Sequence, residues 1–204
     1  MKTAAAIAAV LGALAGCVSI PEVPSREYYV LEDRAPAGAT KPATGGGRVL
    51  LVNPATANPF YDTQNLVFSR APGQRAYYQF AGWTERPGYT LCELLARRLE
   101  AGGGFRAVAP TTAGVRGEVV LHLRLEEFYH DVSEKPGSVR IEATAVLVDS
   151  VQRTLIARRR FVESAPVADE NARAAVSALN QATSALLDEM AAWVEAAAAQ
   201  AGAR

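Results

Sequence analysis

Cys17 is the residue whose neighbours most clearly favour a covalent reaction, because a cysteine thiolate is a nucleophile. Two small residues, Ala15 and Gly16, stand directly before it, and an apolar run from Ala4 to Ala15 leads up to it. Lys2 places a positive charge at the start of the chain. A charged start, an apolar stretch and a small-residue cleavage site are typical of a secretory signal peptide. The run is too short for a membrane-spanning helix, which needs about 20 apolar residues.

The four residues Leu14-Ala15-Gly16-Cys17 resemble the lipobox of bacterial lipoproteins. The resemblance implies that diacylglycerol and an N-acyl chain are attached at Cys17, and that residues 1–16 are removed as a lipoprotein signal peptide. A plain secreted protein with an incidental cysteine is the alternative. Val18 stands where an aspartate would resemble the inner-membrane retention signal of enteric bacteria. We therefore expect the chain at the periplasmic face of the outer membrane rather than at the inner membrane.

Composition excludes two classes of protein. Half of the 204 residues are hydrophobic, and 21 basic side chains balance 21 acidic ones. A nucleic-acid binder usually carries basic residues in excess, and a disordered chain has fewer hydrophobic residues. Cleavage before Cys17 would remove Lys2 and leave 20 basic against 21 acidic side chains. We expect one folded domain that binds no nucleic acid.

The histidines do not form a convincing metal site. His122 and His130 lie eight residues apart on an expected strand, with Glu126 between them, so all three would point the same way. The two Cα atoms would be about 26 Å apart, too far to share a metal ion, and we expect both histidines at the surface. Adjacent Glu126 and Glu127 would face opposite sides of the strand. No G-x-S-x-G or H-E-x-x-H motif occurs. We therefore expect no catalytic residue, no bound metal, no cofactor and no enzyme activity.

Two other features have structural and functional interpretations. Cys92, Leu95 and Leu99 share one face of an expected helix, which favours a buried Cys92 over a reactive thiol. In the run Arg158-Arg159-Arg160, strand alternation sends the middle side chain opposite to its neighbours. A solvated face is therefore favoured over a site for a partner or a lipid headgroup.

The segment from Tyr61 to Tyr89 is dense in aromatic residues, and its candidates for contact with a partner or a lipid are Tyr77, Tyr78, Phe80 and Trp83. Aromatic rings with polar tips can line a groove or an interface, since each covers a large area and keeps a hydrogen bond. Packing in the core is an equally good interpretation of the cluster.

These residues must be positioned by strands and helices that hydrophobic periodicity predicts. Residues 17–26 form a lipidated tether, residues 27–199 the domain, and residues 200–204 a tail. Strands are expected over 27–32, 48–52, 65–70, 75–80, 105–109, 118–131, 138–149 and 154–164, with helices over 87–101 and from about 170 to 199. The last three strands should form an antiparallel meander. The result is a single compact layered α/β domain, in which two main helices pack on a mixed, largely antiparallel sheet.

The stretch from Ala76 to Pro87 (AYYQFAGWTERP), preceded by Asp62 and by LVFSR at 66–70, resembles the ABC-type transport auxiliary lipoprotein family, which includes PqiC-like intermembrane transport lipoproteins. Weaker matches are YYVL at 28–31, FRAV at 105–108, LEEF at 125–128 and RRF at 159–161. The resemblance implies a non-catalytic subunit that a lipid holds at a membrane. Its implied partners are an MCE-domain protein and an ABC permease that move phospholipid or another hydrophobic substrate between membranes, and it could dock on them as a homo-oligomer.

Two alternatives stay open. One is an outer-membrane assembly or scaffold lipoprotein that binds no transporter. The other is a periplasmic enzyme, which would need a pocket with converging titratable groups.

Overall fold

The computed structural model describes residues 25–34 and 47–202 of the chain. The expected lipidation of Cys17, the cleavage before it and most of the tether therefore lie outside the described residues.

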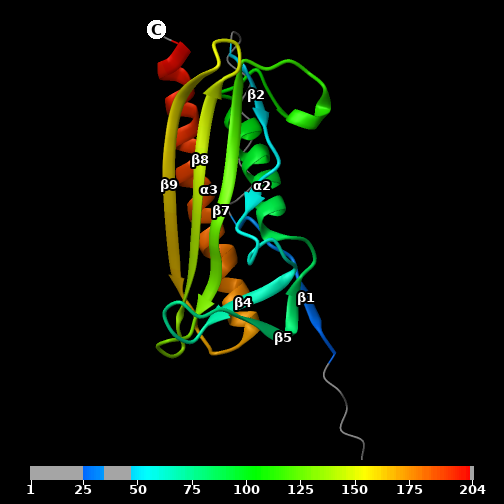
Figure 1. The fold of residues 1–204 in the computed structure, drawn as a ribbon, viewed down its shortest axis with the longest axis vertical. Coiled ribbons are helices and arrows are strands. Elements are labelled where there is room, and N and C mark those ends of the chain that lie inside the picture. Colours follow the sequence, from blue (N-terminus) through cyan, green and yellow to red (C-terminus); the bar gives the residue numbers. More distant parts are fainter. Residues whose placement is uncertain (1–24, 35–46, 203–204) are drawn as a thin grey trace, which may run out of the picture.

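Nine strands and two long helices make up the described fold (Figure 1). The strands are β1 (Glu27–Tyr29), β2 (Val49–Val52), β3 (Thr56–Ala57), β4 (Asn65–Ser69), β5 (Ala76–Trp83), β6 (Ala107–Pro110), β7 (Val119–Asp131), β8 (Ser138–Asp149) and β9 (Thr154–Pro166). The helices are α2 (Pro87–Gly102), the short 3-10 turn η1 (Thr111–Ala113) and α3 (Ala172–Gly202). The expected layered α/β fold, with a mixed sheet and two helices, is confirmed.

Strand β7 organises the sheet. One of its edges pairs with β8 along the whole strand in antiparallel fashion, and β8 pairs likewise with β9, which is the expected meander. The other edge meets β2, β3 and β4 in succession, each in parallel register. Beyond them, β6 extends β2, while β5 and then β1 extend β4. The longest ladders are antiparallel, and three short strands share the edge of β7 that β8 leaves free.

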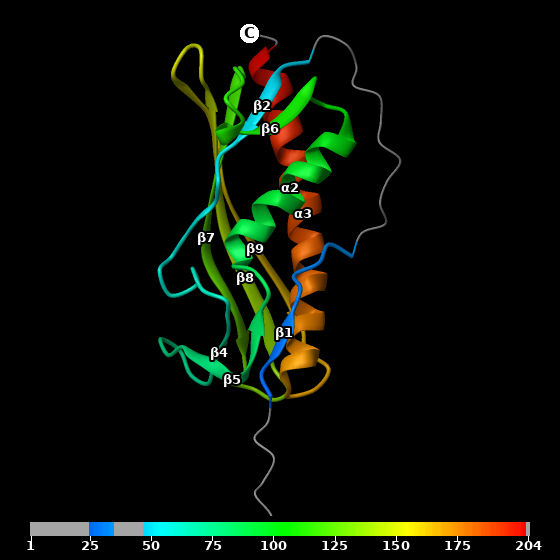
Figure 2. The ribbon, with the colours of Figure 1, turned by 90° about the vertical axis from the view of Figure 1, so that its right-hand side faces the viewer.

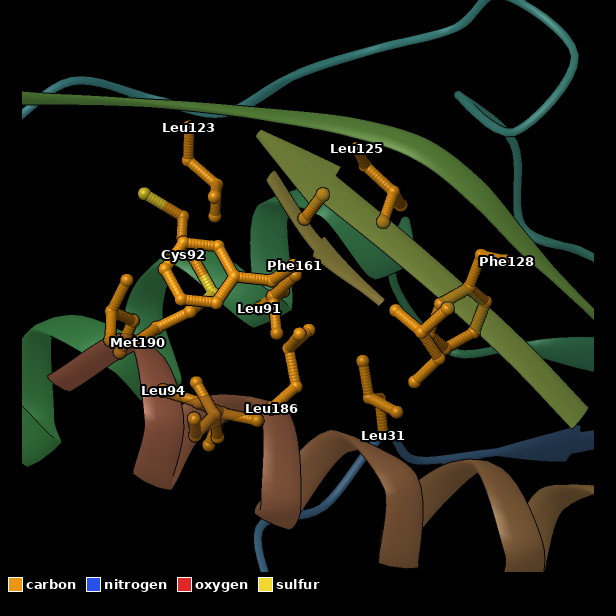
Figure 3. Close-up of a cluster of buried hydrophobic side chains, with 14 of the residues drawn as sticks. Leu31, Leu91, Cys92, Leu94, Leu123, Leu125, Phe128, Phe161, Leu186 and Met190 are labelled. Carbon is orange, nitrogen blue, oxygen red and sulfur yellow. The ribbon is translucent and has the colours of Figure 1, made fainter. Parts of the chain in front are cut away.

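Helices α2 and α3 lie on one face of the sheet (Figure 2). Leu121, Leu123 and Leu125 alternate along β7 and are buried beneath them. From the helices, Leu91, Leu186 and Met190 point toward Leu123 and Leu125 (Figure 3). Each fully buried side chain of this kind stabilises the fold by about 1.5–3 kcal/mol, so the core rather than a disulfide holds the described domain together.

The helix ends follow local chemistry. Pro87 occupies the first turn of α2, where a missing backbone N–H costs nothing. Gly103 ends that helix in the left-handed conformation, with φ of 72°. The Asn171 side chain accepts a hydrogen bond from the backbone N–H of Ala174 at 2.8 Å and so caps α3. In the described part of the chain, no helix combines the length and the apolar character needed to cross a membrane.

Strand β7 contains a bulge that the alternation pattern does not reveal. Leu125 pairs with Ala143, but Glu127 pairs with Glu142, so Glu126 is an extra residue. The side chains beyond the bulge are shifted by one position, which turns His130 toward the helices while His122 stays on the opposite, exposed face. The expectation that both histidines point the same way and lie at the surface is therefore wrong for His130, which is fully buried.

Candidate functional site

A cleft of about 930 Å³ opens at one end of the molecule. Residues 76–81 of β5 form one wall, and residues 170–173 at the start of α3 face them. Ser25 and the β1 residues Glu27 and Tyr29 line the same space, as do Phe68 of β4 and Arg70 just after it. Figure 2 shows β1, β4, β5 and the beginning of α3 together at this end. We refer to this space as the end cleft.

Three of the four predicted contact residues line the end cleft. Tyr77 and Phe80 expose 41% and 39% of their surface, so both are accessible to a ligand or partner. The Tyr77 ring stacks on that of Phe60 with 4.7 Å between centroids, and this fixes its orientation. Tyr78 is half-buried and contacts the Phe68 ring edge-on at 5.0 Å. The aromatic wall is thus partly ordered by packing and partly open to solvent.

Trp83, the fourth candidate, was expected to contact a partner or a lipid, but it lies in the core. It exposes 1% of its surface and packs edge-to-face on Phe128 of β7, with 5.6 Å between centroids. The ladder between β4 and β5 is irregular, since Asn65 pairs with Gly82 whereas Val67 already pairs with Tyr77. This irregularity breaks the simple alternation along β5. Trp83 therefore belongs to the core and is unavailable to a partner or a lipid.

Tyr78 connects the end cleft to the buried histidine. The Nδ1 atom of His130 lies 2.8 Å from the Tyr78 hydroxyl, and its Nε2 atom lies 3.0 Å from the carbonyl oxygen of Pro136. A carbonyl can only accept, so Nε2 carries the proton and Nδ1 accepts from the tyrosine. Burial lowers the pKa of His130 and raises the pKa of Tyr78. Both groups are consequently neutral at pH 7, and the pair acts as a fixed support for the cleft wall.

Four charged side chains of the described residues line the end cleft: Glu27, Arg70, Glu170 and Arg173. Arg173 lies 3.6 Å from Glu27, whose carboxylate also accepts a hydrogen bond from the Tyr29 hydroxyl. Glu170 pairs with Lys135 at 2.8 Å. The guanidinium of Arg70 lies 4.6 Å from the centre of the Phe68 ring. The two carboxylates of the cleft are therefore already paired with cations.

The arginine run alternates as predicted. Arg159 pairs with Glu189 of α3 and lies over the Phe161 ring, on the helix side of the sheet. Arg160 faces the other side, where its Nε atom lies 2.5 Å from Glu142. Arg140 joins Glu142 to Glu127, so an ion-pair ladder crosses β7, β8 and β9. The hydrogen bond from Arg160 lowers the pKa of Glu142. Two of the three arginines in the run thus have carboxylate partners within the chain.

Cys92 is buried, as predicted, and its thiol donates to the backbone oxygen of Asn53 at 3.3 Å. Burial raises its pKa to about 11, so a thiolate hardly forms at neutral pH. Within residues 25–34 and 47–202, no group of three or more His, Cys, Asp or Glu side chains is arranged to hold a metal ion. The end cleft offers aromatic faces, hydroxyl groups and a guanidinium, which are groups that bind an amphiphilic molecule.

The family of ABC-type transport auxiliary lipoprotein components matches this sequence over residues 29–191. The chain belongs to this family. The match begins in β1 and ends within α3, so it includes nearly the whole sheet, α2 and both long walls of the end cleft. The resemblance inferred from the 76–87 segment is confirmed, and membership in a family of transport lipoproteins indicates a lipid-anchored component of the cell envelope.

Solved structures share the fold. Protein XCC0632 from Xanthomonas campestris, of family DUF330, is 23% identical, with 87% of this chain and 99% of that chain covered and a TM-score of 0.78. The hypothetical protein CT253 from Chlamydia trachomatis is 12% identical, with 75% and 98% covered and a TM-score of 0.53. No curated protein matches the sequence.

Sequence reasoning missed the charged residues of the end cleft. Arg70 follows a strand, and Glu170 and Arg173 stand about 100 residues later along the chain. No local pattern joins them, because only the folded arrangement places the end of β4 and the start of α3 around one cleft. Arg70 did stand within the LVFSR segment that supports the family resemblance, and that was the available signal.

Proposed function

We propose that this chain is a non-catalytic auxiliary subunit of an ABC/MCE-type system that transports phospholipid or another hydrophobic substrate between membranes. The observation that carries the proposal is the family match over residues 29–191. An ABC permease and an MCE-domain protein would be its partners, and ATP hydrolysis would belong to another subunit of the same system.

The proposed organisation begins with removal of residues 1–16 and acylation of Cys17. Each buried methylene of an acyl chain contributes about 0.8 kcal/mol, so several chains hold a folded domain firmly at a membrane. Residues 17–26 form the tether, residues 27–199 the folded domain and residues 200–204 the tail. Val18 supports the periplasmic face of the outer membrane as the location.

The exposed rings of Tyr77 and Phe80 support a contact with a partner or a lipid, since solvent-exposed aromatic residues are enriched at interfaces. Both belong to the end of the domain that carries the tether. A partner that binds here would lie close to the membrane that anchors the chain.

Crosslinking in cells followed by purification of the lipidated protein tests the proposal. We expect an MCE-domain or permease subunit in the crosslinked material. A matched sample of the Cys17→Ser variant should give much less, because that variant would be released from the membrane. Recovery of neither subunit, together with unchanged growth on detergent after deletion of the gene, would contradict the proposal and favour a scaffold lipoprotein.

A further inference from the structure

We propose that the end cleft receives the phosphate-bearing headgroup of a phospholipid in the membrane to which the chain is anchored. The inference rests on the lipid anchor of the proposed function, and it deepens that function by naming a ligand and the residue that binds it. The position of the cleft, its charges and its aromatic lining each support this ligand.

The position of the end cleft is set by the length of the tether. Ser25 lines the cleft and follows Cys17 by eight residues. Eight residues span at most about 28 Å when fully extended. The cleft therefore stays within about 30 Å of the acylated residue, while the turn between β8 and β9 lies at the other end of the molecule (Figure 1). Of the two ends, the one with the cleft is held next to the bilayer surface.

Among the described residues that line the end cleft, one cation is left for a ligand. Glu27 is paired with Arg173 and Glu170 with Lys135, as described above. Among the residues that the structure describes, no carboxylate lies within 4.0 Å of the Arg70 guanidinium. A guanidinium can donate two parallel hydrogen bonds to a phosphate, which makes arginine a suitable ligand for a phosphodiester.

Aromatic packing holds Arg70 toward the cleft. Its guanidinium lies 4.6 Å from the centre of the Phe68 ring. Phe68 and Tyr78 are themselves fixed by their mutual contact at 5.0 Å. The cation thus lies over a ring that contacts Tyr78, and the Tyr78 hydroxyl in turn hydrogen-bonds to the buried His130.

The remaining lining suits a headgroup at the membrane interface. Tyr77 and Phe80 are exposed, and aromatic rings of this kind are enriched where a bilayer meets water. A volume of about 930 Å³ lies in the range of small-molecule clefts. The phosphate would bind Arg70, and the glycerol region would contact the two rings while the acyl chains stay in the bilayer.

The test uses the full mature chain, residues 17–204, with Cys17→Ser so that it carries no acyl chain. It is floated with vesicles of phosphatidylethanolamine and phosphatidylglycerol, and with vesicles of the phosphate-free lipid digalactosyldiacylglycerol. We expect binding to the phospholipid vesicles to be about tenfold stronger. Arg70→Gln should lower that binding about tenfold, because the neutral amide loses the charge-assisted hydrogen bonds from the guanidinium to the phosphate.

Arg116→Gln is the matched control, since Arg116 is exposed in the loop before β7, far from β4. It should bind as the unsubstituted chain does, and thermal unfolding should show that both variants are folded. Equal binding to the two vesicle types, or an unchanged Arg70→Gln variant, would overturn the proposal. Calorimetric binding of soluble glycerol 3-phosphate as strong as vesicle binding would assign the cleft to a soluble phosphate ester and overturn the lipid assignment. Crosslinking to transporter subunits does not depend on Arg70, so it separates a failure here from a failure of the proposed function.

Discussion

Arg98 of α2 binds both carboxylate oxygens of Asp33, with its Nε and Nη2 atoms each 2.6 Å from an oxygen. Asp33 also accepts a hydrogen bond from the hydroxyl of Ser184 in α3 at 2.9 Å. Arg98 and Asp33 expose 16% and 17% of their side chains. The segment that follows β1 is thus attached to both helices, and β1 is the strand nearest the tether. A pull on the tether would be transmitted to the helical layer as well as to the sheet.

Replacement of Arg98 should therefore destabilise the whole domain. We expect Arg98→Ala to lower the free energy of unfolding by about 2–3 kcal/mol, because it leaves a largely buried carboxylate without its bidentate donor. Arg97→Ala is the neighbouring control, since Arg97 is exposed and pairs across one helical turn with Glu93; it should cost less than about 0.5 kcal/mol. Urea unfolding measures both free energies. Equal losses of stability in the two variants would contradict a stabilising role for the Arg98–Asp33 pair.

The turn between β7 and β8 depends on Gly137. Its φ is 97°, and a Cβ at this position would lie 2.1 Å from the carbonyl oxygen of Asp131. Gly114 has a φ of 71°, but a Cβ there would meet no other atom within 4 Å. Gly114→Ala should cost about 1 kcal/mol for its backbone conformation alone, and Gly137→Ala clearly more because of the clash. Thermal unfolding of the two variants gives the comparison, and similar midpoints would argue against a tight turn.

The buried pair of His130 and Tyr78 predicts how stability depends on pH. Burial lowers the pKa of His130 in the folded chain below its ordinary value of 6.5. As the pH falls below 6.5, the unfolded chain takes up a proton that the folded chain resists, so stability decreases. Urea unfolding from pH 7 down to about 5 should show this loss, in a range above the ordinary carboxylate pKa values.

Variants of the two histidines assign this loss. His130→Gln should be less stable at pH 7 but should show a flatter dependence on pH. His122→Gln is the matched control for replacing a histidine, because His122 is exposed on the opposite face of β7. A slope that survives in His130→Gln would assign the titration to another group.

The sequence predicted those elements that have a local cause. The stripe of Leu91, Leu95 and Leu99 has the helical period, and it is buried in α2. The alternation of Leu121, Leu123 and Leu125 likewise fixed the inner face of β7 up to the bulge. Short turns between the last three strands allowed only antiparallel neighbours, so the meander could be predicted as well.

The features that the sequence did not predict depend on contacts between distant parts of the chain. The bulge at Glu126 turns His130 inward. No residue type near Glu126 indicates that β7 has an extra residue relative to β8 at this point. The two-residue strand β3 exists because Thr56 and Ala57 meet β7, not because of their own preference. The end cleft combines β5 with the start of α3, about 90 residues away, so its charged lining could not be inferred from spacing.

Cys92 should be chemically inert in the folded chain. It exposes 7% of its surface, and burial raises the pKa of its thiol to about 11, so the reactive thiolate is scarce at neutral pH. In the Cys17→Ser chain, we expect a disulfide reagent such as DTNB to react slowly with the native protein and rapidly after addition of urea. A rapid reaction of the native protein would contradict the buried position.

Cys17 should be the site of lipid attachment, because the small residues of the lipobox precede it directly. Cys17→Ser should abolish incorporation of an alkyne-labelled fatty acid and move the protein from the membrane fraction to the soluble fraction. Cys92→Ala is the matched cysteine control and should keep both label and location. Cys92 cannot take over as the acceptor, since it is buried within folded α2 and donates its thiol hydrogen to Asn53. Label that persists in Cys17→Ser would therefore point to an acceptor other than either cysteine and would contradict the lipobox.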